Sequence, residues 1–147
     1  KITFNKVEAD EIRRSLEGLS GYLTEVLKVQ QIEPEFQISV LVIAPYSAQV
    51  KLLKRELERS TKLACLAVEV RTIDQVQGRE ADLVFYSATR SCANPESTGF
   101  ISEARLNVAL SRARNSLVIV GDAPFWDSGP TKLSEVLEYC RELEPSE

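Results

Sequence analysis

Two arginines in the segment EARLNVALSRARN, residues 103–115, have the residue type and spacing to bind an anion. Arg105 and Arg112 are seven residues apart, so a helix through this segment places both on one face, away from its apolar stripe. Neither has an acidic residue three or four positions away with which to pair. Two such guanidinium groups suit an external anion, and phosphate above all. Taken alone, the pattern is also explained by a solvated helix face or by pairing with acids elsewhere in the fold.

A second candidate is the turn-forming segment RTIDQVQGRE, residues 71–80. Gly78 can adopt a positive φ and lets backbone N–H groups approach a ligand. Asp74 can cap a short helical turn. Glu80 has Arg79 as its one obvious local partner, and a carboxylate beside a glycine turn can accept hydrogen bonds from a ribose hydroxyl. A plain connection between two strands is the competing explanation.

A third candidate is IAPYSAQ, residues 43–49, where Pro45 fixes a turn and Tyr46 places an aromatic ring at a strand end. An exposed aromatic ring can stack on a nucleic-acid base. Packing in the core or at its rim is the alternative interpretation of this tyrosine.

The elements that must position these residues follow from hydrophobic patterning. Continuous apolar runs at 38–44, 68–73, 83–88 and 117–120 predict strands buried on both faces. Amphipathic spacing predicts helices at 9–31, 48–59, 103–112 and 133–143, with a short strand at 2–4 and a loop at 91–99. This alternation predicts an α/β fold, a parallel sheet with helices on both faces. Each motif follows a strand, so we expect all three at the carboxyl ends of the strands.

Composition limits the class of protein. With 147 residues the chain has the length of one domain, and because it starts at Lys1 and contains no Met, we expect a piece of a longer protein. No apolar run approaches the roughly 18–20 residues of a membrane span. Scattered Cys65, Cys92 and Cys140, with no His, give no zinc spacing and predict reduced thiols in a cytoplasmic or nuclear protein. A net charge of −4 argues against autonomous nucleic-acid binding.

In their order along the chain, VLVIAPYSAQ, TIDQVQGREADLVFYSATR and GFISEARLNVALSRARNSLVIVGD resemble motifs IV, V and VI of superfamily 1 helicases. The similarity is to the family typified by the nonsense-mediated-decay RNA helicase, senataxin and the nuclease-helicases of replication. It extends from about Asn5 to Asp122. The resemblance implies a RecA-like, P-loop NTPase-like fold and identifies residues 1–147 with the second, C-terminal motor domain of such a helicase.

The resemblance also implies roles for individual residues. In that family ATP lies between two RecA-like domains, so Arg112 would be the arginine finger on the γ-phosphate and Glu80 would contact the ribose. The nucleotide-binding residues would also include Gln77, Gly78, Arg79 and Arg105. Contacts to the backbone of single-stranded DNA or RNA would come from Thr72, Asp74, Pro45, Tyr46 and Gln49.

The sequence contains no GxxxxGK[ST] segment and no acidic pair placed after a strand for magnesium. ATP and Mg²⁺ are therefore expected in the full-length protein, held by the first RecA-like domain, and the 147-residue chain alone is expected to be inactive. Two alternatives stay open: a non-catalytic helicase-like interaction module, and a nucleic-acid-binding domain acting alone, against which the acidic balance argues.

Overall fold

The computed structural model of the chain describes residues 4–32, 35–90, 102–128 and 131–142. Within these residues four strands form one parallel sheet in the order β2-β1-β3-β4. The strands are β1 (Ile38–Ala44), β2 (Leu66–Thr72), β3 (Ala81–Ser87) and β4 (Ala113–Val120). The helices are α1 (Lys6–Gln30), α2 (Ser47–Glu58), α3 (Glu103–Leu110), α4 (Ala123–Asp127) and α5 (Lys132–Glu142), with a 3-10 turn η1 (Ile73–Gln75).

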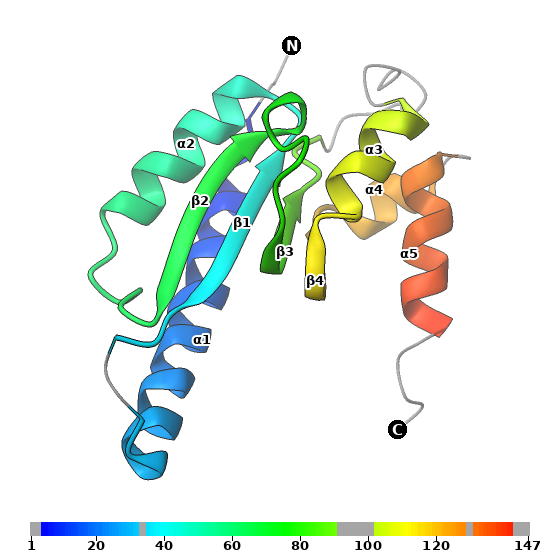
Figure 1. Cartoon of the computed structure of the whole chain (residues 1–147). Coiled ribbons are helices and arrows are strands. Elements are labelled where there is room, and N and C mark those ends of the chain that lie inside the picture. Colours follow the sequence, from blue (N-terminus) through cyan, green and yellow to red (C-terminus); the bar gives the residue numbers. More distant parts are fainter. Residues whose placement is uncertain (1–3, 33–34, 91–101, 129–130, 143–147) are drawn as a thin grey trace.

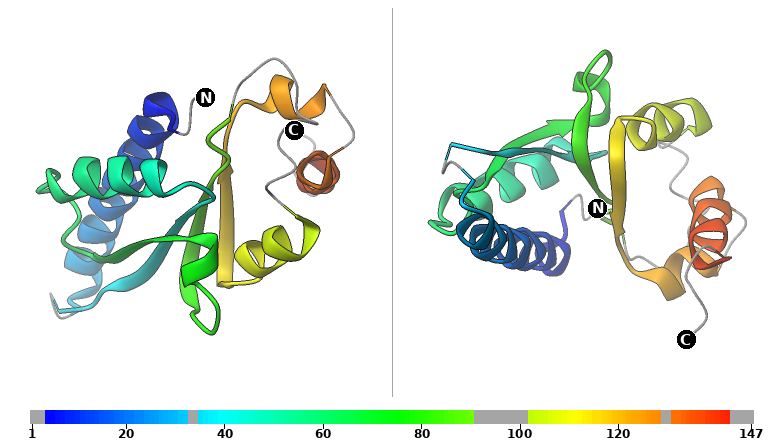
Figure 2. Two further views of the ribbon diagram at one scale, coloured as in Figure 1. Left: turned by 90° about the horizontal axis from the view of Figure 1, so that it is seen from above. Right: turned by 60° about the horizontal axis from the view of Figure 1, so that its bottom comes forward.

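Helices cover both faces of the sheet, which confirms the predicted α/β class. Helices α1 and α2 lie on one side, and α3, α4 and α5 lie on the other (Figures 1 and 2). Alternate residues of β1 explain the two layers, because successive strand side chains point to opposite faces. Val40 and Val42 pack with α1 and α2, whereas Leu41 and Ile43 pack with η1, α3 and α4.

Strand β4 differs from the prediction of a strand buried on both faces. It is an edge strand whose side chains are exposed or half-buried, and Val118 retains 37% of its accessible surface. Among the described residues strand β2 is the opposite edge, and only β1 and β3 have neighbours on both sides. A run of apolar residues indicates that the faces of a strand are buried, but it does not indicate how many neighbouring strands it has. The sequence therefore could not distinguish the edge strands β2 and β4 from central strands.

The start of α1 and the whole of α4 differ from the prediction, because side-chain caps determine where these helices begin. Helix α1 begins before the predicted Ala9, since the Asn5 side chain accepts a hydrogen bond of 3.2 Å from the Glu8 N–H. Helix α4 was not predicted at all. The Asp122 carboxylate accepts a 3.2 Å hydrogen bond from the Phe125 N–H and starts a short helix that buries Phe125 and Trp126. The predicted 91–99 loop and residues 2–3 of the predicted first strand lie outside the described residues; Phe4 belongs to no strand.

Candidate functional site

The predicted site residues separate into two groups at opposite ends of the strands. We call the side of the sheet where the strands end the carboxyl edge, and the side where they begin the amino edge. Pro45 and Thr72 lie at the carboxyl ends of β1 and β2, as expected. Glu80 and Arg112 instead immediately precede β3 and β4, whose first paired residues are Ala81 and Ala113. The expectation that all three motifs lie at the carboxyl edge is therefore wrong for these two side chains, because the segments carrying them return to the amino edge before the next parallel strand begins.

The crossover segment, residues 73–80, joins the two edges. It is anchored by Ile73 and Val76, which are 2% and 0% exposed. The Gln75 side-chain oxygen accepts the Thr72 backbone N–H at 3.1 Å, so Gln75, and not Asp74 as predicted, stabilises the start of the turn. Gly78 has φ +76°, which confirms the predicted positive φ. Gln77 is exposed beside it.

Arg112 lies in the turn between α3 and β4, beside the end of the crossover segment. Its Nη1 donates to the Arg79 carbonyl at 3.4 Å and its Nη2 donates to the Ser111 hydroxyl at 2.9 Å. The Arg112 carbonyl accepts the Ala81 N–H at 3.1 Å. This bond holds the backbone of Arg112 against Ala81, the residue that follows Glu80. Within the described part of the chain Arg112 forms no ion pair, and its hydrogen-bond acceptors there are the two neutral oxygens of Arg79 and Ser111.

Arg105 does not share a face with Arg112, contrary to the prediction. Helix α3 ends at Leu110, so Arg112 follows the helix and does not continue its periodicity. Arg105 lies near the other end of α3, where its Nη2 contacts the Asp74 carboxylate at 2.6 Å. This ion pair links α3 to η1 at the carboxyl edge. It joins Arg105, predicted to contact the nucleotide, to Asp74, predicted to contact nucleic acid.

Glu80 is an exposed carboxylate with an unexpected partner. The Nε atom of Arg114 donates to it at 3.3 Å. Arg79, the partner suggested by sequence, instead contacts Glu69 of β2 at 2.6 Å. A hollow of about 310 Å³ lies beside Glu80, lined also by Arg79 and Ala81 and by residues 39–41 and 67–69 of the two neighbouring strands.

Tyr46 is half-buried at the carboxyl edge, and one face of its ring is already covered. The guanidinium carbon of Arg90 lies 5.5 Å from the ring centroid, a cation–π arrangement. Arg90 is 5% exposed. This contact agrees with the packing interpretation of Tyr46, and base stacking, the other interpretation, stays a prediction. Pro45 beside it is buried.

Gln49 is fully buried and cannot contact nucleic acid directly, which corrects its predicted role. Its amide accepts the Asn5 N–H at 2.7 Å and donates to the Ser87 hydroxyl at 3.0 Å. Ser87 and the N–H of Thr89 both donate to Glu8, at 2.6 and 2.8 Å. Thr89 has φ +71°, an unusual backbone conformation that these bonds hold in place.

Burial raises the pKa of Glu8 to about 7, against the opposing hydrogen bonds from Ser87 and Thr89. Glu8 was not among the predicted site residues. The N-x-x-E spacing of Asn5 and Glu8 is at most the signal of a helix start, and the burial of Glu8 depends on contacts with β3, about eighty positions away.

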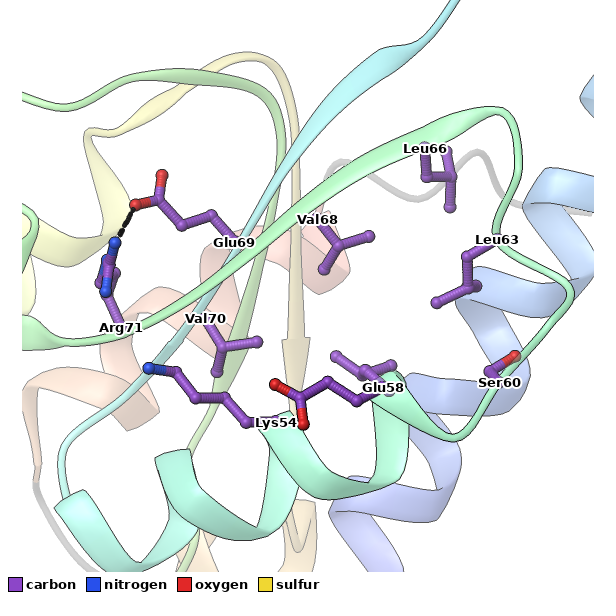
Figure 3. Close-up of a pocket in the computed structure, with 10 residues that line it drawn as sticks. Lys54, Glu58, Ser60, Leu63, Leu66, Val68, Glu69, Val70 and Arg71 are labelled. Atoms are coloured by element: carbon purple, nitrogen blue, oxygen red, sulfur yellow. Dashed lines mark hydrogen bonds and ion pairs between the residues drawn. The ribbon is translucent and has the colours of Figure 1, made fainter.

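One further feature, a surface groove, lies apart from the predicted residues. A groove of about 470 Å³ follows the outer edge of β2 beside α2; Figure 3 shows its aliphatic walls and the ion pair between Glu69 and Arg71. None of the predicted site residues lines this groove.

A metal site and a membrane span are both absent from the described residues. No cluster of His, Cys, Asp or Glu among them has the arrangement of a metal site, and none of their helices has the length and apolar character of a membrane span. Cys65 and Cys140 are free thiols; Cys92 lies outside the described residues.

Comparison with known proteins gives a consistent result. Residues 1–124 match the family described as an AAA domain. The chain is 41% identical over 106 residues to the DNA polymerase alpha-associated DNA helicase A of Saccharomyces cerevisiae, covering 71% of this chain and 15% of that protein. It is 34% identical over 126 residues to an uncharacterized ATP-dependent helicase of Methanocaldococcus jannaschii, covering 82% and 18%.

A third relative is regulator of nonsense transcripts 1 of Dictyostelium discoideum, with 37% identity over 97 residues, 59% of this chain and 7% of that protein. The chain thus spans less than a fifth of the length of each of these relatives.

Proposed function

Because this chain belongs to the AAA-domain family of superfamily 1 helicases, we propose that it is the second motor domain of such an enzyme and acts on ATP bound by a separate first domain. The longer protein would be an ATP-dependent helicase working on single-stranded DNA or RNA in the cytoplasm or nucleus. The observation that carries the proposal is the Arg112 guanidinium, which forms no ion pair among the described residues and donates to the carbonyl of Arg79, the residue before Glu80.

Arg112 suits the role of an arginine finger on physical grounds. Phosphoryl transfer spreads negative charge over the equatorial phosphate oxygens, and a planar, permanently charged donor stabilises that charge. The Arg112 Nη atoms donate to two neutral oxygens, the Arg79 carbonyl and the Ser111 hydroxyl, and can exchange these bonds for stronger, charge-assisted bonds to phosphate oxygens.

The neighbouring residues support a nucleotide-facing edge. Gly78 gives a backbone turn that an L side chain rarely adopts, and exposed Gln77 and Glu80 flank it. Glu80 can accept hydrogen bonds from a ribose hydroxyl. Mg²⁺ would neutralise phosphate charge during transfer, and we assign its ligands and the phosphate-binding loop to the first domain, since the chain has no GxxxxGK[ST] segment.

The carboxyl edge is the proposed contact surface for the nucleic-acid backbone. Thr72, Asp74 and Tyr46 lie at that edge, with buried Pro45 shaping the turn. The crossover segment runs from this edge to Glu80, and Arg112 donates to its Arg79 carbonyl, so a change in nucleotide contacts has a short route to the nucleic-acid contacts. Closure of the two domains around ATP, followed by opening after hydrolysis, would be a population shift driven by contacts that exist only in the closed state.

Arg112→Ala in the longer protein tests the proposal. We expect kcat for ATP hydrolysis to fall by about 10³–10⁵-fold, the range for removal of an arginine finger. Affinity for single-stranded nucleic acid should change by no more than about twofold, because other residues make those contacts. Arg59→Ala is the matched control, since this exposed arginine of the α1–α2 side makes only a 4.0 Å ion pair with Glu56. Near-normal kcat in Arg112→Ala would rule out the finger role.

A further inference from the structure

Arg114, the second residue of β4, is an arginine for which the proposed function has no role. Its Nε donates to Glu80 at 3.3 Å, and its Nη1 lies 3.8 Å from the Asp82 carboxylate. The guanidinium therefore bridges two acids, one that immediately precedes β3 and one inside that strand. Both Arg114 and Glu80 are more than half exposed, so this arrangement faces solvent at the amino edge of the sheet.

A β-bulge places Arg114 in this position. Ala81 pairs with Ala113 and Leu83 pairs with Ser116, so the single residue Asp82 faces two residues of β4, Arg114 and Asn115. A bulge of this kind redirects a side chain and is common beside functional sites. The extra residue turns Arg114 toward the start of β3.

Asp82 gives Arg114 a fixed anchor. The Asp82 carboxylate accepts hydrogen bonds from the Ser39 hydroxyl at 2.7 Å and from the Ser39 N–H at 3.1 Å. These bonds, with the charge of Arg114, hold the pKa of Asp82 below its ordinary value, so the group stays ionised at neutral pH. Asp82 thus holds Arg114 from within β3, and Arg114 in turn holds Glu80.

The other arginines near Glu80 are directed elsewhere. Arg79 contacts Glu69, and Arg112 donates to a backbone carbonyl and a hydroxyl. In the described ranges Arg114 is the ion-pair partner of Glu80. Arg112 has no carboxylate partner among the described residues, and its backbone and guanidinium contact Ala81 and Arg79, the residues on either side of Glu80. Without Arg114, capture of Arg112 by Glu80 would withdraw both groups from a nucleotide.

We propose that Arg114 is a positioning residue, which holds the Glu80 carboxylate in place to accept a ribose hydroxyl and so sets the selectivity of the site for ribonucleotides. The inference rests on the proposed function, because it takes Glu80 as the ribose contact. An ion pair between exposed groups adds little to folding stability. The effect of losing Arg114 should therefore appear in nucleotide selectivity and not in unfolding.

The test measures equilibrium binding to the longer protein by titration calorimetry. The probes are a non-hydrolysable ATP analogue and its 2′-deoxy and 3′-deoxy forms. For the unmodified protein we expect the ribose form to bind about tenfold more tightly than one deoxy form, the effect of one hydrogen bond to a charged group. Glu80→Ala should abolish that preference. Arg114→Gln should reduce it by about two- to fivefold, and Arg114→Lys should restore it only in part, because an ammonium group lacks the fork that reaches two acids.

The double variant Glu80→Ala/Arg114→Gln should match Glu80→Ala alone, since Arg114 acts through Glu80. Arg141→Gln is the control, an exposed arginine whose 2.7 Å pair with Asp127 lies on α5 and α4, and should leave the preference unchanged. If Glu80→Ala abolishes the preference while Arg114→Gln retains it fully, the positioning role is overturned and the ribose contact stands. If the unmodified protein shows no preference for the ribose form, or if Glu80→Ala retains the preference in full, the proposed ribose contact fails, and the role of Arg114 with it.

Discussion

At the scale of single residues, the crossover segment depends on one glycine. Gly78 has φ +76°, and a Cβ added there would meet no atom within 4 Å, so the backbone alone decides the effect of substitution. Gly78→Ala should lower the free energy of unfolding of the 147-residue chain by about 1–2 kcal/mol, the cost of a left-handed conformation for an L residue. Denaturant titration measures this change directly.

Gly21→Ala is the matched control for that experiment. Gly21 also has open space around it but lies inside helix α1, where alanine is favoured by about 0.8–1 kcal/mol. The two substitutions add the same methyl group and should shift stability in opposite directions. Equal effects of the same sign would show that residue 78 does not hold a left-handed conformation in solution.

Glu8 gives the second residue-scale prediction, a pH dependence of stability. Its pKa is raised to about 7 in the folded chain against an ordinary value of 4.5. The folded state therefore binds the proton more tightly than the unfolded state, and this contribution is full below pH 4.5 and lost as the pH rises to about 7. Between about pH 5 and pH 8, the unmodified chain should lose roughly 2–3 kcal/mol relative to a chain without this group.

Glu8→Gln supplies the comparison, because its amide oxygen can still accept the hydrogen bonds from Ser87 and Thr89 without carrying a charge. The difference in unfolding free energy between the two chains, measured by denaturant titration across that pH range, isolates Glu8 from other titrating groups. A difference that stays constant with pH would mean that the Glu8 carboxyl titrates near its ordinary value.

At the scale of elements, local patterning was enough to predict the alternation of strands and helices. The apolar run ISVLVIA, closed by Pro45, predicted β1 with its observed bounds. Side-chain caps at Asn5 and Asp122 moved or created helices because a single hydrogen bond at a helix start outweighs weak propensity. The exposure of β4 could not be predicted, since the order of strands is a property of the whole sheet.

The predicted site was only partly accessible from sequence for a related reason. Gly78 was assigned correctly because a turn makes a local demand on the backbone. The partners of Asp74, Arg79 and Glu80 come from residues 31, 10 and 34 positions away, and no local pattern encodes such pairs. Arg105 and Arg112 were placed together because a helix was extended two residues too far.

At the scale of the whole molecule, the acidic charge balance argues against strong nucleic-acid binding by this chain alone. Its net charge is −4, and the resemblance places the triphosphate and magnesium groups in another domain. We expect the purified 147-residue chain to show no ATP hydrolysis above background. We also expect it to bind single-stranded nucleic acid only weakly, with Kd in the range of roughly 10⁻⁴–10⁻⁶ M.

A filter-binding titration at low salt, together with a phosphate-release assay, checks both expectations. Tight binding by the isolated chain would favour a nucleic-acid-binding domain acting alone. Turnover by the isolated chain would contradict the assignment of the triphosphate site to a first domain.

The most direct measurement is a structure of the longer protein with ADP, Mg²⁺, aluminium fluoride and single-stranded nucleic acid, which mimics the transition state of hydrolysis. The account predicts that the Arg112 guanidinium leaves the Arg79 carbonyl and lies about 3 Å from the fluoride group, with Glu80 on the ribose. A closed structure in which Arg112 keeps its contacts to Arg79 and Ser111, and another cation contacts the fluoride, would contradict it.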